Sequence, residues 1–285
     1  MLANFSKIAV IGAGTMGNGI AHVFAQKGYQ VNLIDISQEA LDKGVATITK
    51  NMDRQIKKER LTETQKTESL NRIQVHTDLS VGVSDRNLVI EAATENEALK
   101  GKIFAQLDAA APADAILATN TSSISITRIA AVTQRSDKVI GMHFMNPVPV
   151  MKLIEIIRGY DTSDAVAQHI VQLSEDLGKV PVTVNDYPGF VANRILMPMI
   201  NEAIYTLYEG VADAEAIDTV MKLGMAHPMG PLTLADFIGL DVCLSILEVL
   251  YEGFGNPKYA PCPLLKNMVA AGHLGRKSGK GFYAY

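Results

Sequence analysis

The sequence predicts an α/β fold of the Rossmann type, a doubly wound and mostly parallel sheet with a helical arm, followed by an all-α C-terminal domain. Three observations support this prediction. A glycine-rich segment at residues 12–17 follows a short apolar run and opens a helical pattern. Short apolar runs then alternate with helical patterns as far as residue 184, as in a parallel sheet covered on both faces. From Pro188 onward only helical patterns remain.

Length and composition narrow the class of protein. A chain of 285 residues favours two domains, and contents of 48% hydrophobic and 20% charged residues are ordinary for a globular protein. A net charge of −4 does not suggest a nucleic-acid partner. The start of the chain lacks the basic and apolar regions of a signal peptide, and no apolar run is as long as a membrane span. We therefore expect a soluble cytoplasmic protein without a membrane partner.

The first elements form a βαβ unit. Residues 7–11 are a short apolar run that predicts a buried strand, and residues 14–27 have helical periodicity that Gly28 closes. Residues 30–34 are a second strand, which ends at Asp35. The unit occupies about 30 residues, as a βαβ unit should.

The next segment, about 38–71, is long, polar and free of proline. It predicts two helices with a break near residues 59–62, which would protrude as an arm from the first domain. The alternative is a solvated pair of surface helices, which the composition alone also fits.

The rest of the chain divides near residue 185. We expect domains at 1–185 and 186–285. Further strands are expected at 73–76, 88–91, 116–118, 138–143, 151–157 and 180–184, with helices at 100–110 and 164–177; the second domain should hold helices at 190–209, 214–223, 232–251 and 263–271. The two cysteines, Cys243 and Cys262, have no metal-binding spacing, so we expect no metal site and a buried thiol at Cys243.

The segment Gly12-Ala13-Gly14-Thr15-Met16-Gly17 fits the pattern G-x-G-x-x-G between a predicted strand and a predicted helix, the setting of a dinucleotide-binding motif. Gly12 permits the tight turn, Gly14 lets the backbone approach a pyrophosphate, and Gly17 lets the helix pack closely on the strand. The helix N-terminus then offers N–H groups to the phosphates.

Asp35 ends the second predicted strand, where a carboxylate can accept hydrogen bonds from both ribose hydroxyls. It would repel a 2′-phosphate, and no basic residue follows before Lys43, so NAD is favoured over NADP. The alternative is an ordinary turn carboxylate.

His143 and Glu155 flank a proline-rich segment that can reverse the chain. If the apolar runs on either side pair as strands, the two side chains become neighbours at one edge of the sheet. An imidazole oriented by a carboxylate is a general base. The alternatives are a structural histidine and an edge-strand glutamate that points to water.

Several linked motifs along the whole chain resemble the 3-hydroxyacyl-CoA dehydrogenase family, most closely its short bacterial members that act on 3-hydroxybutyryl-CoA. The motifs are Gly12-x-Gly14-x-Met16-Gly17, Asn120-Thr121-Ser122-Ser123, the segment from His143 to Glu155, Pro188-Gly189-Phe190-Val191-Ala192-Asn193-Arg194, His227-Pro228-Met229-Gly230-Pro231 and Gly275-Arg276-Lys277-Ser278-Gly279. The activity implied is NAD-dependent oxidation of an (S)-3-hydroxyacyl-CoA, or the reverse reduction, in a cleft to which the helical domain contributes.

The resemblance also implies roles for single residues. His143 would be the general base, Glu155 would orient it, Ser122 would hydrogen-bond the substrate oxygen, and Asn193 would position the reacting group. The residues expected near the cofactor are Gly12, Gly14, Thr15, Met16, Gly17, Asp35, Glu95, Lys100, Ser122, Asn146 and Lys277. The family binds CoA through basic residues of its helical arm, and the candidates here are Arg54, Lys57 and Lys58; Arg54 stands where relatives often carry lysine.

Three of these residues also have simpler explanations. Ser122 could cap the helix that follows it. Asn193 could satisfy backbone groups in the turn at Gly189. Lys277 lies in a basic tail that could merely be solvated.

Two rival functions stay open at this point. β-Hydroxyacid dehydrogenases acting on free acids share the glycine pattern and a helical second domain, but usually rely on a lysine rather than a histidine–glutamate pair. A crystallin-like or nucleotide-sensing protein would need no catalysis, yet the set Ser122, His143, Glu155 and Asn193 favours chemistry. Apolar faces at 195–204 and 237–250 predict a homodimer.

Overall fold

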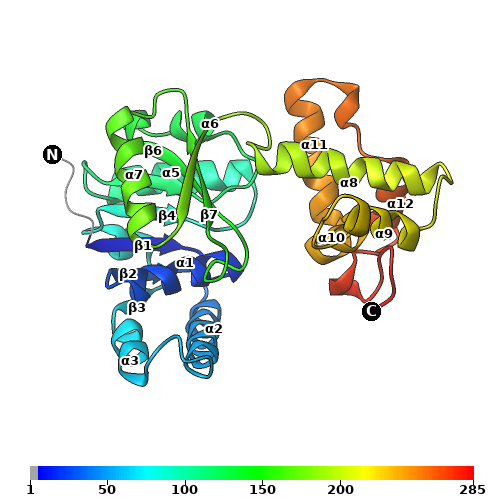
Figure 1. Ribbon diagram of the computed structural model, residues 1–285. Helices are drawn as coiled ribbons and strands as arrows, with labels where there is room; N and C mark the ends of the chain where they lie inside the picture. The colour runs from blue at the N-terminus through cyan, green and yellow to red at the C-terminus, as the bar shows by residue number, and fades with distance from the viewer. Residues whose placement is uncertain (1–5) are drawn as a thin grey trace. The chain divides into compact units, whose positions relative to one another are not determined.

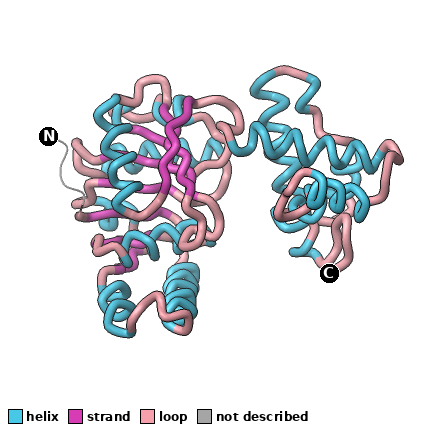
Figure 2. The backbone as a smooth tube through the Cα atoms, viewed as in Figure 1, coloured by secondary structure: helices cyan, strands magenta, loops and turns pink. Residues whose placement is uncertain are grey.

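The computed structural model describes residues 6–285, whose contacts divide the chain into two compact units after Asp186. This division lies one residue beyond the boundary expected from the sequence. All named strands of the described residues belong to the first unit, and the second is helical apart from two isolated bridges near its end (Figures 1 and 2). Each unit has its own hydrophobic core.

The first unit is built on an eight-stranded sheet with the order β3-β2-β1-β4-β5-β6-β7-β8. The strands are β1 (Lys7–Ile11), β2 (Gln30–Ile34), β3 (Ile73–His76), β4 (Leu88–Glu91), β5 (Ile116–Thr119), β6 (Val139–Phe144), β7 (Leu153–Arg158) and β8 (Val180–Asn185). Neighbours are parallel except β6 and β7, which pair antiparallel. The predicted doubly wound, mostly parallel fold is therefore confirmed.

The order of the strands reverses between β1 and β4. A ligand-binding site is expected at this reversal. In open α/β sheets, ligands bind outside the carboxyl ends of the strands at such a switch. The helices that connect the strands are α1 (Thr15–Gln26), α4 (Leu79–Val83), α5 (Glu97–Ala110), α6 (Ile126–Ala130) and α7 (Asp164–Asp176). α4 and α6 have five residues each, too few for a helical period to be visible in the sequence.

The predicted arm consists of α2 (Gln38–Ile56) and α3 (Glu63–Asn71), which Figure 1 shows as a pair beyond the β3 end of the sheet. Thr62 and Gln65 form a capping box that starts α3, and so place the break where it was expected. The arm is more than a solvated helix pair, because Ile48 and Met52 of α2 are fully buried in the core of the unit.

The second unit contains α8 (Ala192–Tyr208), α9 (Ala214–Gly224), α10 (Pro231–Ile238), α11 (Leu240–Phe254) and α12 (Pro263–Ala270). The single helix predicted over 232–251 is wrong, because Gly239 has a φ of 107° and interrupts it. A glycine adopts this conformation at little cost, so α10 and α11 can change direction there. Cys243 and Cys262 are free, buried thiols. Among the described residues, no helix combines the length and the apolar character of a transmembrane segment.

Candidate active site

The glycine-rich loop joins β1 to α1, and two of its glycines are required by packing within the protein. A Cβ on Gly17 would lie 1.7 Å from the carbonyl oxygen of Gly12. A Cβ on Gly12 would lie 2.7 Å from the carbonyl oxygen of Ala92, and Gly12 also has a φ of 96°. These two positions therefore have the roles that the motif predicts, the tight turn and the close contact of helix and strand.

Packing within the protein does not require a glycine at position 14. Its φ of −63° suits any residue, and a Cβ placed on it would meet nothing within 4 Å. Gly14 is exposed at the N-terminus of α1, beside the exposed Thr15. The open space in front of this backbone fits a pyrophosphate that must come close to N–H groups at a helix N-terminus. The fold thus leaves room for a dinucleotide where the motif expects one.

Asp35 follows β2 and holds the loop in place. Its Oδ2 accepts a hydrogen bond of 2.9 Å from the backbone N–H of Ala13, and its Oδ1 accepts one of 3.1 Å from Ser37 N–H. The residue is only partly buried. Because each carboxylate oxygen has more than one acceptor site, the turn role and a ribose contact are compatible.

His143 and Glu155 face each other across β6 and β7 in the predicted register. His143 Nδ1 lies 2.7 Å from Glu155 Oε2, and both side chains are buried, with 8% and 3% exposed. The pair is not at an edge of the sheet, because β8 covers β7 on its other side. This geometry excludes the alternative of an edge-strand glutamate pointing to water, since Glu155 is buried on an interior strand beside the imidazole.

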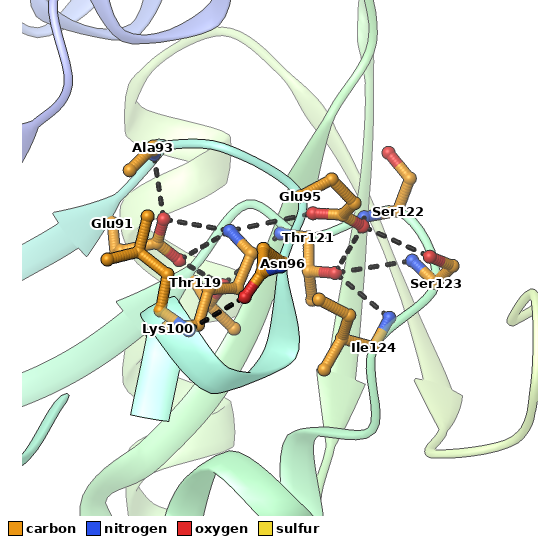
Figure 3. A network of polar contacts seen from close by, with 11 residues as sticks. Glu91, Ala93, Glu95, Asn96, Lys100, Thr119, Thr121, Ser122, Ser123 and Ile124 are labelled. Carbon is orange, nitrogen blue, oxygen red and sulfur yellow. Dashed lines mark hydrogen bonds and ion pairs between the residues drawn. The ribbon is translucent and has the colours of Figure 1, made fainter. Parts of the chain in front are cut away.

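Glu95 holds the loop that carries Ser122 (Figure 3). Its Oε1 accepts hydrogen bonds from the Thr121 hydroxyl at 2.6 Å, the Ser122 backbone N–H at 2.8 Å and the Ser123 hydroxyl at 3.1 Å. The cap of α6 is Ser125, whose hydroxyl accepts from Arg128 N–H, so the capping explanation of Ser122 is wrong.

Lys100, which is expected near the cofactor, is a buried lysine paired with carboxylates. Its side chain is 1% exposed, and its Nζ donates to both carboxylate oxygens of Glu91 at 2.8 Å. Its ammonium also lies 3.5 Å from Glu95 Oε2. A buried lysine needs carboxylate partners, and Lys100 has two of them. It therefore lies behind Glu95, where it contacts the Glu95 carboxylate.

Asn146 lies in the loop between β6 and β7, on the wall of a cavity of about 440 Å³. The opposite walls come from the glycine-rich loop and from α2, with Gly14, Thr15 and Thr47 among the lining residues. The structure therefore brings Asn146 close to the glycine-rich loop, as expected.

A second, larger cavity of about 1000 Å³ shares Asn51, Pro147 and Pro149 with the first. Two of the three predicted CoA contacts, Arg54 and Lys58, line it, whereas Lys57 is exposed but is not among its lining residues. Its walls are strongly basic. Further cations come from Lys27, Arg60, Arg72, Lys152 and Lys179, against the single carboxylate of Glu68.

The second unit carries the two remaining candidates. Asn193 is in the first turn of α8, 8% exposed, and its backbone N–H bonds to the carbonyl of Gly189. Lys277 lies in the tail, where its ammonium pairs with Asp241 Oδ2 at 2.6 Å while its side chain stays 46% exposed.

Two residues that the sequence analysis did not identify connect the parts of this site. Glu91 is a charged residue at the end of the apolar run Leu88-Val89-Ile90, and a charge in such a run is a signal that the sequence does offer. Lys179 donates to the carbonyls of Val148 and Met151 at 2.5 and 2.7 Å, which ties β8 to the loop of Asn146. Burial lowers the pKa of Lys179. Nothing in the sequence around Lys179 indicates that it contacts the loop of Asn146.

Comparisons with known proteins agree with this arrangement. Residues 7–187 match the 3-hydroxyacyl-CoA dehydrogenase NAD binding domain, and residues 189–285 match the 3-hydroxyacyl-CoA dehydrogenase C-terminal domain. A probable 3-hydroxybutyryl-CoA dehydrogenase of Bacillus subtilis is 56% identical over 98% of this chain and 97% of its own length. A 3-hydroxybutyryl-CoA dehydrogenase of Bradyrhizobium diazoefficiens is 55% identical over 100% and 97%.

The solved structures lead to the same family. The crystal structure of (S)-3-hydroxybutyryl-CoA dehydrogenase from Ralstonia eutropha has a TM-score of 0.96 and 55% identity, and the match covers 99% of each chain. Fold, site and comparisons together define an oxidoreductase with a domain for a nicotinamide cofactor. The chain belongs to the 3-hydroxyacyl-CoA dehydrogenase family.

Proposed function

We propose that this chain catalyses the NAD-dependent interconversion of (S)-3-hydroxybutyryl-CoA and acetoacetyl-CoA. The observation that carries the proposal is the buried pair of His143 and Glu155, with 2.7 Å between Nδ1 and Oε2, in a unit that also holds the glycine-rich loop. The names of relatives that are more than half identical along nearly their full length support this choice of substrate.

His143 is the general base of this mechanism. Glu155 accepts the Nδ1–H, which places the imidazole lone pair on Nε2, the atom that takes the proton of the substrate hydroxyl. The buried carboxylate then stabilises the imidazolium that forms. When bound, a nicotinamide supplies the acceptor for hydride from C3. Ser122 and Asn193 are proposed to hydrogen-bond and position the reacting group, and the reduction runs through the same steps in reverse.

Basic residues of the larger cavity support a CoA ester rather than a free acid. Arg54 and Lys58 of the arm line it with Lys152 and Lys179, and such a density of positive charge suits the phosphates of CoA. A small free acid has no group that would reach these residues as well as His143. We propose Arg54 and Lys58 as CoA contacts.

The carboxylate of Asp35 supports NAD over NADP. It sits at the end of β2, tied to Ala13 N–H of the glycine-rich loop, where a 2′-phosphate would meet its negative charge. Thr15, Met16, Glu95, Asn146 and Lys277 are proposed to complete the cofactor site, and Lys100 to act from beneath Glu95.

The test is NADH oxidation followed by absorbance, with acetoacetyl-CoA and free acetoacetate in parallel, and with NADPH in place of NADH. We expect turnover with the CoA ester and NADH. Turnover with the free acid would instead favour a β-hydroxyacid dehydrogenase. Binding of NADH without turnover of either substrate would favour a structural or nucleotide-sensing role and contradict the proposal.

We also propose a homodimer in the cytoplasm. The proposed dimer is supported by exposed apolar side chains of the second unit, among them Ile195, Val220, Leu223 and Phe237. Residues such as Ile200 and Leu247, which the sequence also placed on apolar faces, pack in the core of the unit itself. The two free thiols are typical of a reducing compartment. Sedimentation equilibrium tests the dimer, and a monomer at all concentrations would contradict it.

A further inference from the structure

Glu91 is a fully buried carboxylate at the end of β4. It accepts hydrogen bonds from Ala93 N–H at 2.7 Å, from the Thr119 hydroxyl at 2.7 Å and from Lys100 Nζ at 2.8 Å. Its neighbour Ala92 supplies the carbonyl against which Gly12 is packed. A buried charge persists only when it is paired and hydrogen-bonded in this way.

The ammonium of Lys100 contacts two carboxylates, one buried and one exposed. Glu91 is 0% exposed, whereas the Glu95 side chain on the other side of the ammonium is 41% exposed. A carboxylate exposed to this degree would normally sample several rotamers. Here one of its oxygens faces a cation that is itself fixed by Glu91, so Glu91 acts on Glu95 through Lys100.

Glu95 in turn holds the loop from Asn120 to Ile124 through its hydrogen bonds to Thr121, Ser122 and Ser123. It binds the N–H of Ser122 while the Ser122 side chain points away from the carboxylates (Figure 3). The same loop reaches β6, because Asn120 Oδ1 accepts the N–H of Phe144, the residue after His143. The backbone N–H of Asn120 bonds to the carbonyl of Glu91 at 2.7 Å.

We propose that Glu91 is a positioning residue, which acts through Lys100 and Glu95 to set the loop that carries Ser122 relative to His143. An ion pair needed only for folding would not require its cation to contact a second, exposed carboxylate. This inference rests on the proposed function, since its effect is measured in that reaction.

The test is a double-mutant cycle of Glu91→Gln and Ser122→Ala, measured as NADH oxidation with acetoacetyl-CoA. Displacing a substrate-positioning group by a fraction of an ångström lowers turnover by about tenfold or more, and we expect this loss of kcat in Glu91→Gln. If Glu91 acts through Ser122, adding Glu91→Gln to Ser122→Ala lowers kcat by no more than about twofold further. Losses that multiply in the double variant would overturn the proposal.

A matched control separates positioning from loss of stability. Asp108 forms another largely buried ion pair of the same unit, with Arg135 at 2.7 Å, and also accepts the N–H of Gln134, so these two partners lie outside residues 119–124. Asp108→Asn should therefore lower thermal stability while kcat of the folded enzyme stays within about twofold of wild type. If Asp108→Asn lowers kcat as much as Glu91→Gln does, the loss of kcat in both variants is explained by impaired folding, and the positioning role is overturned.

Two further variants cover the case in which Glu91→Gln does not fold. Thr119→Val removes one donor to Glu91 and also the hydroxyl that accepts Thr121 N–H at 3.3 Å, so its cycle with Ser122→Ala measures the joint effect of these two contacts on the loop. Glu91→Gln combined with Lys100→Met removes both buried charges, which restores stability more often than breaking the pair. We expect kcat of this double variant to remain about tenfold low, since Glu95 has lost its cation. Recovery of wild-type kcat would refute the role.

Failure of the proposed function gives a different result. Wild-type protein without NADH-dependent turnover of acetoacetyl-CoA contradicts the function itself. Normal turnover by Ser122→Ala in an active enzyme removes the role of Ser122 and the inference with it. If the wild type is active, Ser122→Ala is impaired, and the losses of kcat in Glu91→Gln and Ser122→Ala multiply in the double variant, the role of Glu91 is overturned while the proposed function stands.

Discussion

Two histidines of the first unit are buried, and they differ in the partner that each one has. His143 on β6 lies 2.7 Å from the carboxylate of Glu155, whereas Nε2 of His22 on α1 lies 3.1 Å from the amide oxygen of Gln26. Burial lowers the pKa of His22 to about 4; the hydrogen bond to Gln26 opposes this effect and the charge of Lys179 adds to it. Among the described residues, Nδ1 of His22 has no hydrogen-bond partner.

The proposed catalytic role of His143 depends on this difference. Burial by itself favours the neutral imidazole, so His22 is a packed side chain that stays uncharged at neutral pH. A carboxylate beside the ring both orients it and stabilises its protonated form, which a base needs. Burial alone would not have distinguished the two residues. The predictions that follow test this contrast, from the largest expected effect to the smallest.

Removing the base itself should have the largest effect. A positioned general base contributes about 10²- to 10⁴-fold, so His143→Ala should lower kcat with acetoacetyl-CoA by that factor. NADH affinity, measured by fluorescence titration, should be retained because the glycine-rich loop is unchanged. Turnover close to that of the wild type would show that His143 is structural, like His22.

Removing only the charge beside the base should have a smaller effect. Glu155→Gln keeps the size of the side chain but no longer stabilises the imidazolium, so we expect kcat to fall by about 10²-fold. An unchanged rate would make Glu155 a structural residue.

The second histidine should affect stability instead of turnover. Because the folded-state pKa of His22, about 4, is below the ordinary value of 6.5, the unfolded chain binds more protons between these two values. The contribution of His22 is therefore complete above about pH 6.5 and is lost as the pH falls toward 4. It amounts to about 2 kcal/mol between pH 7 and pH 5.

Urea unfolding at pH 7 and pH 5 measures this loss, with His22→Gln as the reference. The other titrating groups are common to both proteins, so the difference between them isolates His22. An equal pH dependence of wild type and His22→Gln would contradict the lowered pKa.

Giving His22 a carboxylate neighbour tests directly whether the partner of the ring causes the difference between His22 and His143. Gln26→Glu places a negative charge next to the ring, which raises the pKa of His22 and reduces its loss of stability on acidification by about 1 kcal/mol. The same unfolding measurement at two pH values detects the change. No reduction relative to wild type would mean that the carboxylate and the ring do not interact in the variant.

Much of the first unit was predictable because its signals are local. The strand residues, the glycine-rich loop and the break before Thr62 are set by periodicity, backbone sterics and capping within a few residues. The register of His143 and Glu155 was predictable as well, since a short reversing segment leaves few ways to pair the two strands. The break at Gly239 was missed because an apolar helical pattern continues across it.

The sequence by itself determined the class of fold, the glycine-rich loop and the pairing of a histidine with a carboxylate. Only the tertiary structure decided that Lys100 lies buried beneath Glu95, that Ser125 rather than Ser122 caps α6, and that Lys179 supports the loop of Asn146. The physical reason is the range of the interactions. Hydrogen-bonded turns and alternating burial depend on neighbours in the chain, whereas the partner of a buried charge depends on which elements the sheet brings together.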